Sequence, residues 1–169
     1  MTLSRTAIAF ALIAAAASPA AAQSSANRHQ PGPYDIALFK TAKAPKAEGE
    51  ARLVSAESPF GIAVTADGHA RYEVHITVSG LPAPSTLGAY LAYVAWAASP
   101  DLTKWERLGA VHNGESVVGT ADLNKFLLVI TAEASADSSA HAGPTVLHGT
   151  SPSGWLQSFL THPLFRGVY

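Results

Sequence analysis

Cysteine is absent from the 169 residues of this chain. The protein can therefore form no disulfide and no thiolate metal site, and it lacks the attachment point of a lipoprotein's lipid anchor. The single methionine is Met1, which disfavours a copper(I) site built from thioether ligands.

Charge is also scarce: charged residues make up 14% of the chain and the formal net charge is −1. A protein that binds nucleic acid or anionic lipid normally carries a clear basic excess. Lys40, Lys43 and Lys46 cluster, but they stand in a Pro/Ala-rich stretch that is typical of a solvated linker. We therefore expect no nucleic-acid partner.

The longest apolar run covers residues 7–17, which is shorter than the roughly 20 residues that a membrane-spanning helix needs. It follows Arg5 and precedes the small residues Ala20, Ala21 and Ala22. Positive start, apolar run and small cleavage-site residues, in that order, are typical of a secretory signal. We expect residues 1–22 to be a signal peptide and the mature protein to be periplasmic or secreted, with no membrane span.

The remainder is long enough for one domain. Residues 23–49 are polar, contain three prolines and have no sustained periodicity, so we expect a flexible lead-in there. From Glu50 onward, short apolar runs alternate with turn residues. This pattern predicts strands over residues 50–55, 61–65, 71–79, 89–98, 105–111, 116–121, 126–134 and 145–149.

Several short strands with no helix between them predict two packed antiparallel sheets. The expected fold is all-β: an immunoglobulin-like antiparallel β-sandwich of about seven to eight strands over residues 50–150. Strand alternation buries one face of each strand. The residues that we expect to be almost inaccessible are Val74, Ile76, Val78, Val94, Trp96, Leu128 and Ile130.

The last part of the chain, residues 151–169, is rich in large apolar side chains. A short helix is predicted there, with Trp155, Leu156, Phe159 and Leu160 on one face. Such a segment either packs back onto its own domain or docks onto a partner. The candidate partner-binding residues are Trp155, Phe159, Phe165 and Tyr169.

Seven histidines raise the question of a metal site. His141 and His148 lie on either side of a Gly-Pro turn, and His112 could join them across the sheet. Copper(II) or zinc accepts such imidazole ligands. No short ligand spacing is present, however, so surface histidines and no cofactor are the favoured interpretation.

The sequence gives little support for catalysis. The serines near Gly149 do not form the G-x-S-x-G turn of a hydrolase. Four carboxylates stand on or beside predicted strands, but their spacing does not pair them for acid–base chemistry: Glu73, Glu106, Glu115 and Glu133. We therefore expect a protein that is not an enzyme.

Several turn and core motifs resemble one known family. They are Asp67-Gly68, the loop Gly80-Leu81-Pro82-Ala83-Pro84, the strand with Tyr93 and Trp96, and the stretch from Gly143 to Gly149. Together they resemble the extracytoplasmic C-terminal domain of anti-sigma-K-type regulators, which is an immunoglobulin-like sandwich. The family's helical domain and zinc-type Cys/His cluster have no counterpart in this sequence, so the resemblance implies the fold and not sigma-factor binding.

A weaker resemblance is to extensions that precede some bacterial multicopper oxidases. It is carried by Ser58-Pro59-Phe60-Gly61 and Gly149-Thr150-Ser151-Pro152-Ser153, and it implies a copper oxidase as a partner or a neighbour. The leading functional hypothesis is an exported, non-catalytic binding or accessory module that recognises a protein outside the cytoplasm. The alternative is a small periplasmic copper- or zinc-binding protein, accessory to such an oxidase.

The export hypothesis predicts that the mature protein begins at Gln23. Cleavage after Ala22 follows from the small residues that a signal peptidase requires. N-terminal sequencing of the protein recovered from the periplasm or the medium checks this. A membrane-bound product that still carries Met1 would contradict it.

Overall fold

The computed structural model describes residues 32–57, 71–123 and 125–152. These residues form eight β-strands and one short 3-10 helix: β1 (Asp35–Lys40), β2 (Glu48–Ser55), β3 (Tyr72–Ser79), η1 (Pro84–Leu87), β4 (Ala92–Ala98), β5 (Trp105–Val111), β6 (Gly114–Ala121), β7 (Leu127–Glu133) and β8 (Thr145–Thr150). In this part of the chain, no helix has the length and apolar character that would let it cross a membrane. The predicted all-β class is confirmed. The predicted signal peptide, the strand at residues 61–65 and the C-terminal helix lie outside the described residues.

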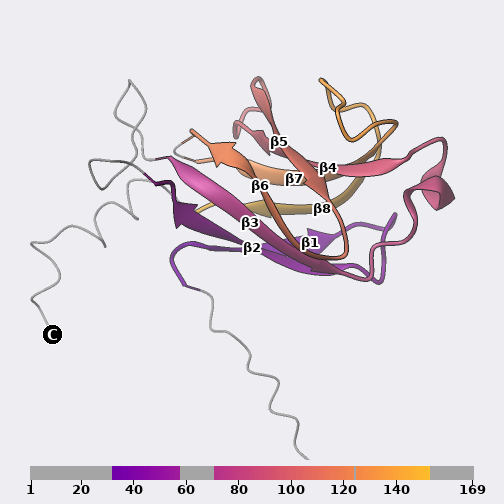
Figure 1. The fold of residues 1–169 in the computed structure, drawn as a ribbon, viewed down its shortest axis with the longest axis horizontal. Helices are drawn as coiled ribbons and strands as arrows, with labels where there is room; N and C mark the ends of the chain where they lie inside the picture. The colour runs from indigo at the N-terminus through magenta and orange to yellow at the C-terminus, as the bar shows by residue number, and fades with distance from the viewer. Residues whose placement is uncertain (1–31, 58–70, 124, 153–169) are drawn as a thin grey trace, which may run out of the picture.

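The strands form an antiparallel sheet in the order β5-β4-β7-β8-β1-β2-β3-β6, which folds over into two layers (Figure 1). Strand β1 belongs to both, because residues 35–38 pair with β2 whereas Phe39 and Lys40 pair with β8. We call β1, β2, β3 and β6 layer A, and β8, β7, β4 and β5 layer B. The hydrophobic core lies between the two layers.

The order of the described strands differs in one respect from that of immunoglobulin domains. In those domains the second and third strands lie in different sheets. Here β2 and β3 are antiparallel neighbours within layer A, and β4 is the first described strand that lies wholly in layer B. The two-layer antiparallel architecture is kept.

The expectation of a flexible lead-in over residues 23–49 is wrong for the second part of that range, because strand β1 lies there. Ile36 and Leu38 alternate with outward-facing residues and are buried in the core. Ala44 and Ala47, in the connection that follows, are buried as well. Prolines on both sides of this short run hide its period-2 pattern. Strand β2 also begins two residues earlier than predicted, at Glu48.

The seven predicted core residues are all at most 1% exposed. Five of them lie between the layers. Val94 and Trp96 instead face the other side of layer B, since the alternate residues Tyr93, Ala95 and Ala97 point into the core. Trp96 is therefore buried beneath the connection between β7 and β8, where its ring meets the ring of His141 edge-on.

A chain of buried hydrogen bonds holds this connection against layer B. The indole N–H of Trp96 donates to the Thr131 hydroxyl at 2.9 Å, and that hydroxyl donates to the Glu133 carboxylate. Glu133 is 2% exposed and also accepts the backbone N–H groups of Ala142 and Gly143, at 3.1 and 3.3 Å. These donors satisfy a carboxylate that would otherwise be costly to bury.

Truncation of Trp96 tests this arrangement. Trp96→Ala deletes a fully buried aromatic side chain and the first donor of the network, so we expect a loss of about 3–5 kcal/mol in unfolding free energy. Urea unfolding measures it. Trp105→Ala is the control and should cost clearly less, because Trp105 is half-buried. Equal losses in the two variants would contradict the burial of Trp96.

Candidate binding surfaces

The outer face of layer A is largely polar, because most apolar residues of its strands point into the core. Its outward side chains include five carboxylates, one arginine and one histidine. We call this surface the acidic face. Its charged and titratable members are Asp35, Glu48, Glu50, Glu73, Glu115, Arg52 and His75.

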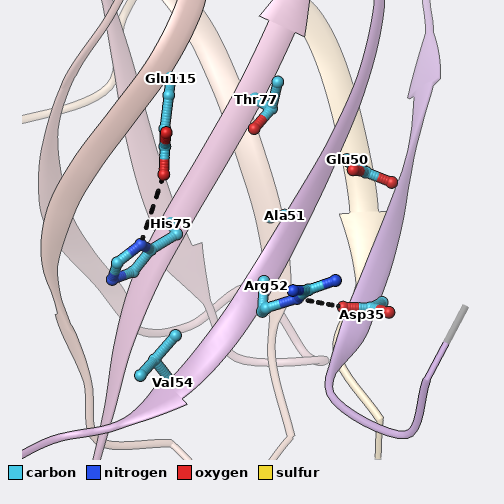
Figure 2. Close-up of a pocket in the computed structure, with 8 residues that line it drawn as sticks. All are labelled: Asp35, Glu50, Ala51, Arg52, Val54, His75, Thr77 and Glu115. Carbon is cyan, nitrogen blue, oxygen red and sulfur yellow. Dashed lines mark hydrogen bonds and ion pairs between the residues drawn. The ribbon is translucent and has the colours of Figure 1, made fainter. Parts of the chain in front are cut away.

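Strand register places Arg52 of β2 between Asp35 of β1 and His75 of β3. The Arg52 Nε–H donates to Asp35 Oδ1 at 2.9 Å, as Figure 2 shows. This hydrogen bond, with the charge of Asp35, raises the pKa of Arg52 above its ordinary value. Arginine is charged at physiological pH in any case, so the pair mainly fixes the position of the guanidinium.

His75 stands between two carboxylates. Its Nε2 lies 3.1 Å from Glu73 Oε2 on the same strand, and its Nδ1 lies 3.8 Å from Glu115 Oε1 on β6. In a neighbouring row of paired residues, Glu50 of β2 lies opposite Thr77 of β3, and Thr77 lies opposite Glu115 of β6. Negative charge is therefore spread across three adjacent strands.

A shallow hollow of about 300 Å³ lies on the acidic face. Figure 2 shows the side chains that line it: Asp35, Glu50, Ala51, Arg52, Val54, His75, Thr77 and Glu115. Val54 stands at its rim, and Val117, directly opposite His75 on β6, is 57% exposed. The surface thus combines carboxylates with exposed apolar groups.

A second concave surface of about 420 Å³ is apolar. The loop at residues 81–84, the start of β4 and the end of β5 line it. Asn113 fixes the loop, since its carboxamide accepts the Leu81 N–H and donates to the Leu81 carbonyl, both at 2.9 Å. The Tyr93 hydroxyl donates to the Pro82 carbonyl at 3.0 Å. We call this surface the apolar cleft; Leu91, 79% exposed, is among its lining residues.

The structure places the three candidate metal ligands in three separate surroundings. The His112 Nδ1 lies 3.0 Å from the carbonyl of the next residue. The His141 ring stacks on the Trp105 ring at 3.7 Å, and the His148 ring lies 6.1 Å from that of Phe39. Within the described ranges, no group of three His, Asp or Glu side chains could hold a metal ion. The candidate partner-binding residues Trp155, Phe159, Phe165 and Tyr169 lie outside those ranges.

Sequence reasoning missed the acidic face. Glu73 and Glu115 drew attention singly, but their spacing of 42 positions gave no reason to place both at His75. The period-2 pattern of residues 71–79 was the available signal, because it puts Glu73, His75 and Thr77 on one side of a strand. Which strands lie on either side of that strand is a tertiary property.

No protein-family model matches the chain, and neither a curated protein nor a solved structure matches it.

The tyrosines at the two ends of the sandwich predict how stability changes in alkali. Burial raises the pKa of Tyr93, and burial together with the nearby Tyr34 raises that of Tyr72. The folded state thus holds these phenol protons more tightly than the unfolded chain does. Their contribution to stability is complete below about pH 10, the ordinary tyrosine value, and is lost as pH rises through the folded-state values.

We therefore expect the unfolding free energy to fall above about pH 10, and to fall less steeply in Tyr93→Phe. Urea unfolding between about pH 8 and pH 11 measures both slopes. The phenylalanine variant also loses the hydrogen bond to the Pro82 carbonyl, which lowers its unfolding free energy at every pH. The comparison is therefore between the two slopes of unfolding free energy against pH, and not between the absolute values. Identical slopes would contradict the prediction.

Proposed function

We propose that this chain is an exported, non-catalytic module that binds a basic protein partner outside the cytoplasm through the acidic face of layer A. The observation that carries the proposal is the charge of that face, where five carboxylates accompany a single arginine and a single histidine. The whole chain has a formal net charge of only −1. The negative charge is therefore a local property of this surface.

This concentration of carboxylates has a cost for the isolated fold. Like charges on neighbouring strands destabilise a sheet, and Glu50 and Glu115 occupy the same cross-strand row with only Thr77 between them. Neutral polar side chains would suit these exposed positions equally well. A partner that carries lysine or arginine would offset the repulsion and would also be attracted from a distance.

The shape of the face suits such a contact. The hollow between β1, β2, β3 and β6 offers oxygen atoms of Glu50, Thr77 and Glu115 to an entering ammonium or guanidinium group. Val54 and Val117 provide apolar contact beside it. Charged groups would then determine which partner binds and how fast, while the apolar groups would add buried area.

A lysine 20-mer peptide is a defined probe of this proposal. We expect it to bind at low ionic strength and to bind about tenfold more weakly to the double variant Glu50→Gln/Glu115→Gln, because two surface charge contacts are lost. Isothermal titration calorimetry of the folded proteins measures the affinities.

The matched control is Glu106→Gln/Asp137→Asn, which removes the same charge from Glu106 of β5 and from Asp137 in the connection between β7 and β8. We expect it to change the affinity by less than about twofold, since distant surface charges are largely screened. Equal weakening in both double variants would show that the peptide senses net charge only. That result, or an absence of binding, would contradict the proposal.

A further inference from the structure

Asn113 lies in the short connection between β5 and β6, and Gly114 follows it as the first residue of β6. In an Asn-Gly pair, the backbone nitrogen of the glycine can attack the side-chain Cγ of the asparagine, since glycine has no Cβ to obstruct the approach. Both residues are exposed. A Cβ built on Gly114 would have no heavy atom nearer than His112 Nδ1 at 3.9 Å, apart from its chain neighbours. The space beside Gly114 is therefore open.

His112 contacts the peptide group that supplies the attacking nitrogen. Its Nδ1 lies 3.0 Å from the Asn113 carbonyl oxygen, and because a carbonyl oxygen only accepts hydrogen bonds, Nδ1 is the donor. When the Gly114 N–H loses its proton, amide resonance places negative charge on this oxygen. A donor aimed at an oxygen where charge develops stabilises that charge. His112 thus favours the form of the Gly114 nitrogen that attacks.

The fold restrains the same reaction through the Asn113 carboxamide. Its Oδ1 accepts the Leu81 N–H and its Nδ2 donates to the Leu81 carbonyl, both at 2.9 Å. Attack on Cγ converts this carbon from planar to tetrahedral, which displaces both polar atoms of the carboxamide. The two hydrogen bonds must therefore open before the reaction proceeds. Because Leu81 is only 6% exposed, we expect this opening to be infrequent and the reaction to be slow.

We propose that Asn113 is a self-modification site, and that its reaction frees the loop at residues 81–84 and changes the wall of the apolar cleft. The Gly114 nitrogen loses its proton and forms a bond to Cγ. The bond between Cγ and Nδ2 breaks, and Nδ2 leaves with one added proton as ammonia. Water then opens the cyclic imide: its hydroxyl group adds to one imide carbonyl, and its remaining hydrogen goes to the nitrogen. The product is aspartate or isoaspartate, and water is the only other reactant.

Either product removes the tie between β5 and the loop. The amide that donated to the Leu81 carbonyl is gone, and a carboxylate oxygen beside that carbonyl leaves two acceptors without a shared hydrogen. Isoaspartate also lengthens the backbone before β6 by a methylene group. Leu81, Pro82, Ala83 and Pro84 line the apolar cleft, so the modification alters this surface. The inference concerns the cleft and does not depend on the acidic face.

The first part of the test measures where the chain reacts. The purified chain is kept at neutral pH for several weeks, and peptide mapping by mass spectrometry measures amide loss at each asparagine. The internal controls are Asn27 and Asn124, which precede Arg28 and Lys125. We expect several-fold more reaction at Asn113 than at either control, and a faster reaction at Asn113 in urea, where the contacts with Leu81 are lost. No excess at Asn113, or no acceleration in urea, would overturn the proposal.

His112→Ala tests the contribution of the imidazole. We expect it to slow the reaction at Asn113 several-fold in the folded chain and to leave the rate in urea unchanged, because the contact exists only in the fold. The melting temperature should stay the same, since the His112 side chain is exposed. Equal slowing in the folded chain and in urea would remove His112 from the proposal and leave Asn-Gly chemistry alone.

The second part measures the effect on the loop. Asn113→Asp reproduces one product, and Asn124→Asp makes the same chemical change elsewhere. We expect Asn113→Asp to lower the melting temperature by about 2–5 °C and to speed hydrogen exchange of residues 80–87 at least about tenfold, with no change in Asn124→Asp. The modified wild-type chain, separated by its added negative charge, should show the same faster exchange. Exchange equal to that of the unmodified chain in both samples would overturn the release of the loop.

Discussion

Strand β1 holds the two layers of this protein together, and it can do so only because Gly149 lies beside it. The strand pairs first with β2 and then with β8, so it must pass very close to the backbone of β8 where it changes partner. A Cβ atom at position 149 would lie 2.5 Å from the Ala37 carbonyl oxygen, a distance that real Cβ atoms do not tolerate. Glycine is therefore required at this crossing.

The rest of the molecule is organised around that crossing. Because the first part of β1 pairs with β2, Asp35 lies opposite Arg52 and the acidic face gains its fourth strand. Ile36 and Leu38, on the same strand, are part of the core between the layers. One short strand thus completes both the interior and the surface that we propose to bind a partner.

The two sides of the sandwich use polar groups in opposite ways. On layer B, the buried network of Trp96, Thr131 and Glu133 satisfies its donors and acceptors internally and holds the connection between β7 and β8 in place. On layer A, the carboxylates outnumber the cations beside them, and Glu48, Glu50 and Glu115 are exposed. A satisfied buried network stabilises and specifies one structure, whereas an unbalanced exposed surface is available to another molecule.

The sequence by itself determined most of the described strands and which of their side chains are buried. The strand at Trp105–Val111 has the predicted bounds, and the seven predicted core residues are buried, because period-2 alternation is a local property of the chain. β1 was missed, since six residues between prolines are too few to show that period.

Only the tertiary structure decided which strands lie together. His75 meets Glu115 because β3 pairs with β6 in one register, and His112, His141 and His148 lie in three separate surroundings. Leu102 has a φ of 59° in a turn that also contains hydrogen bonds of Asp101 and Trp105. Contacts between residues far apart in the chain depend on the packing of whole layers, and spacing along one strand carries no information about them.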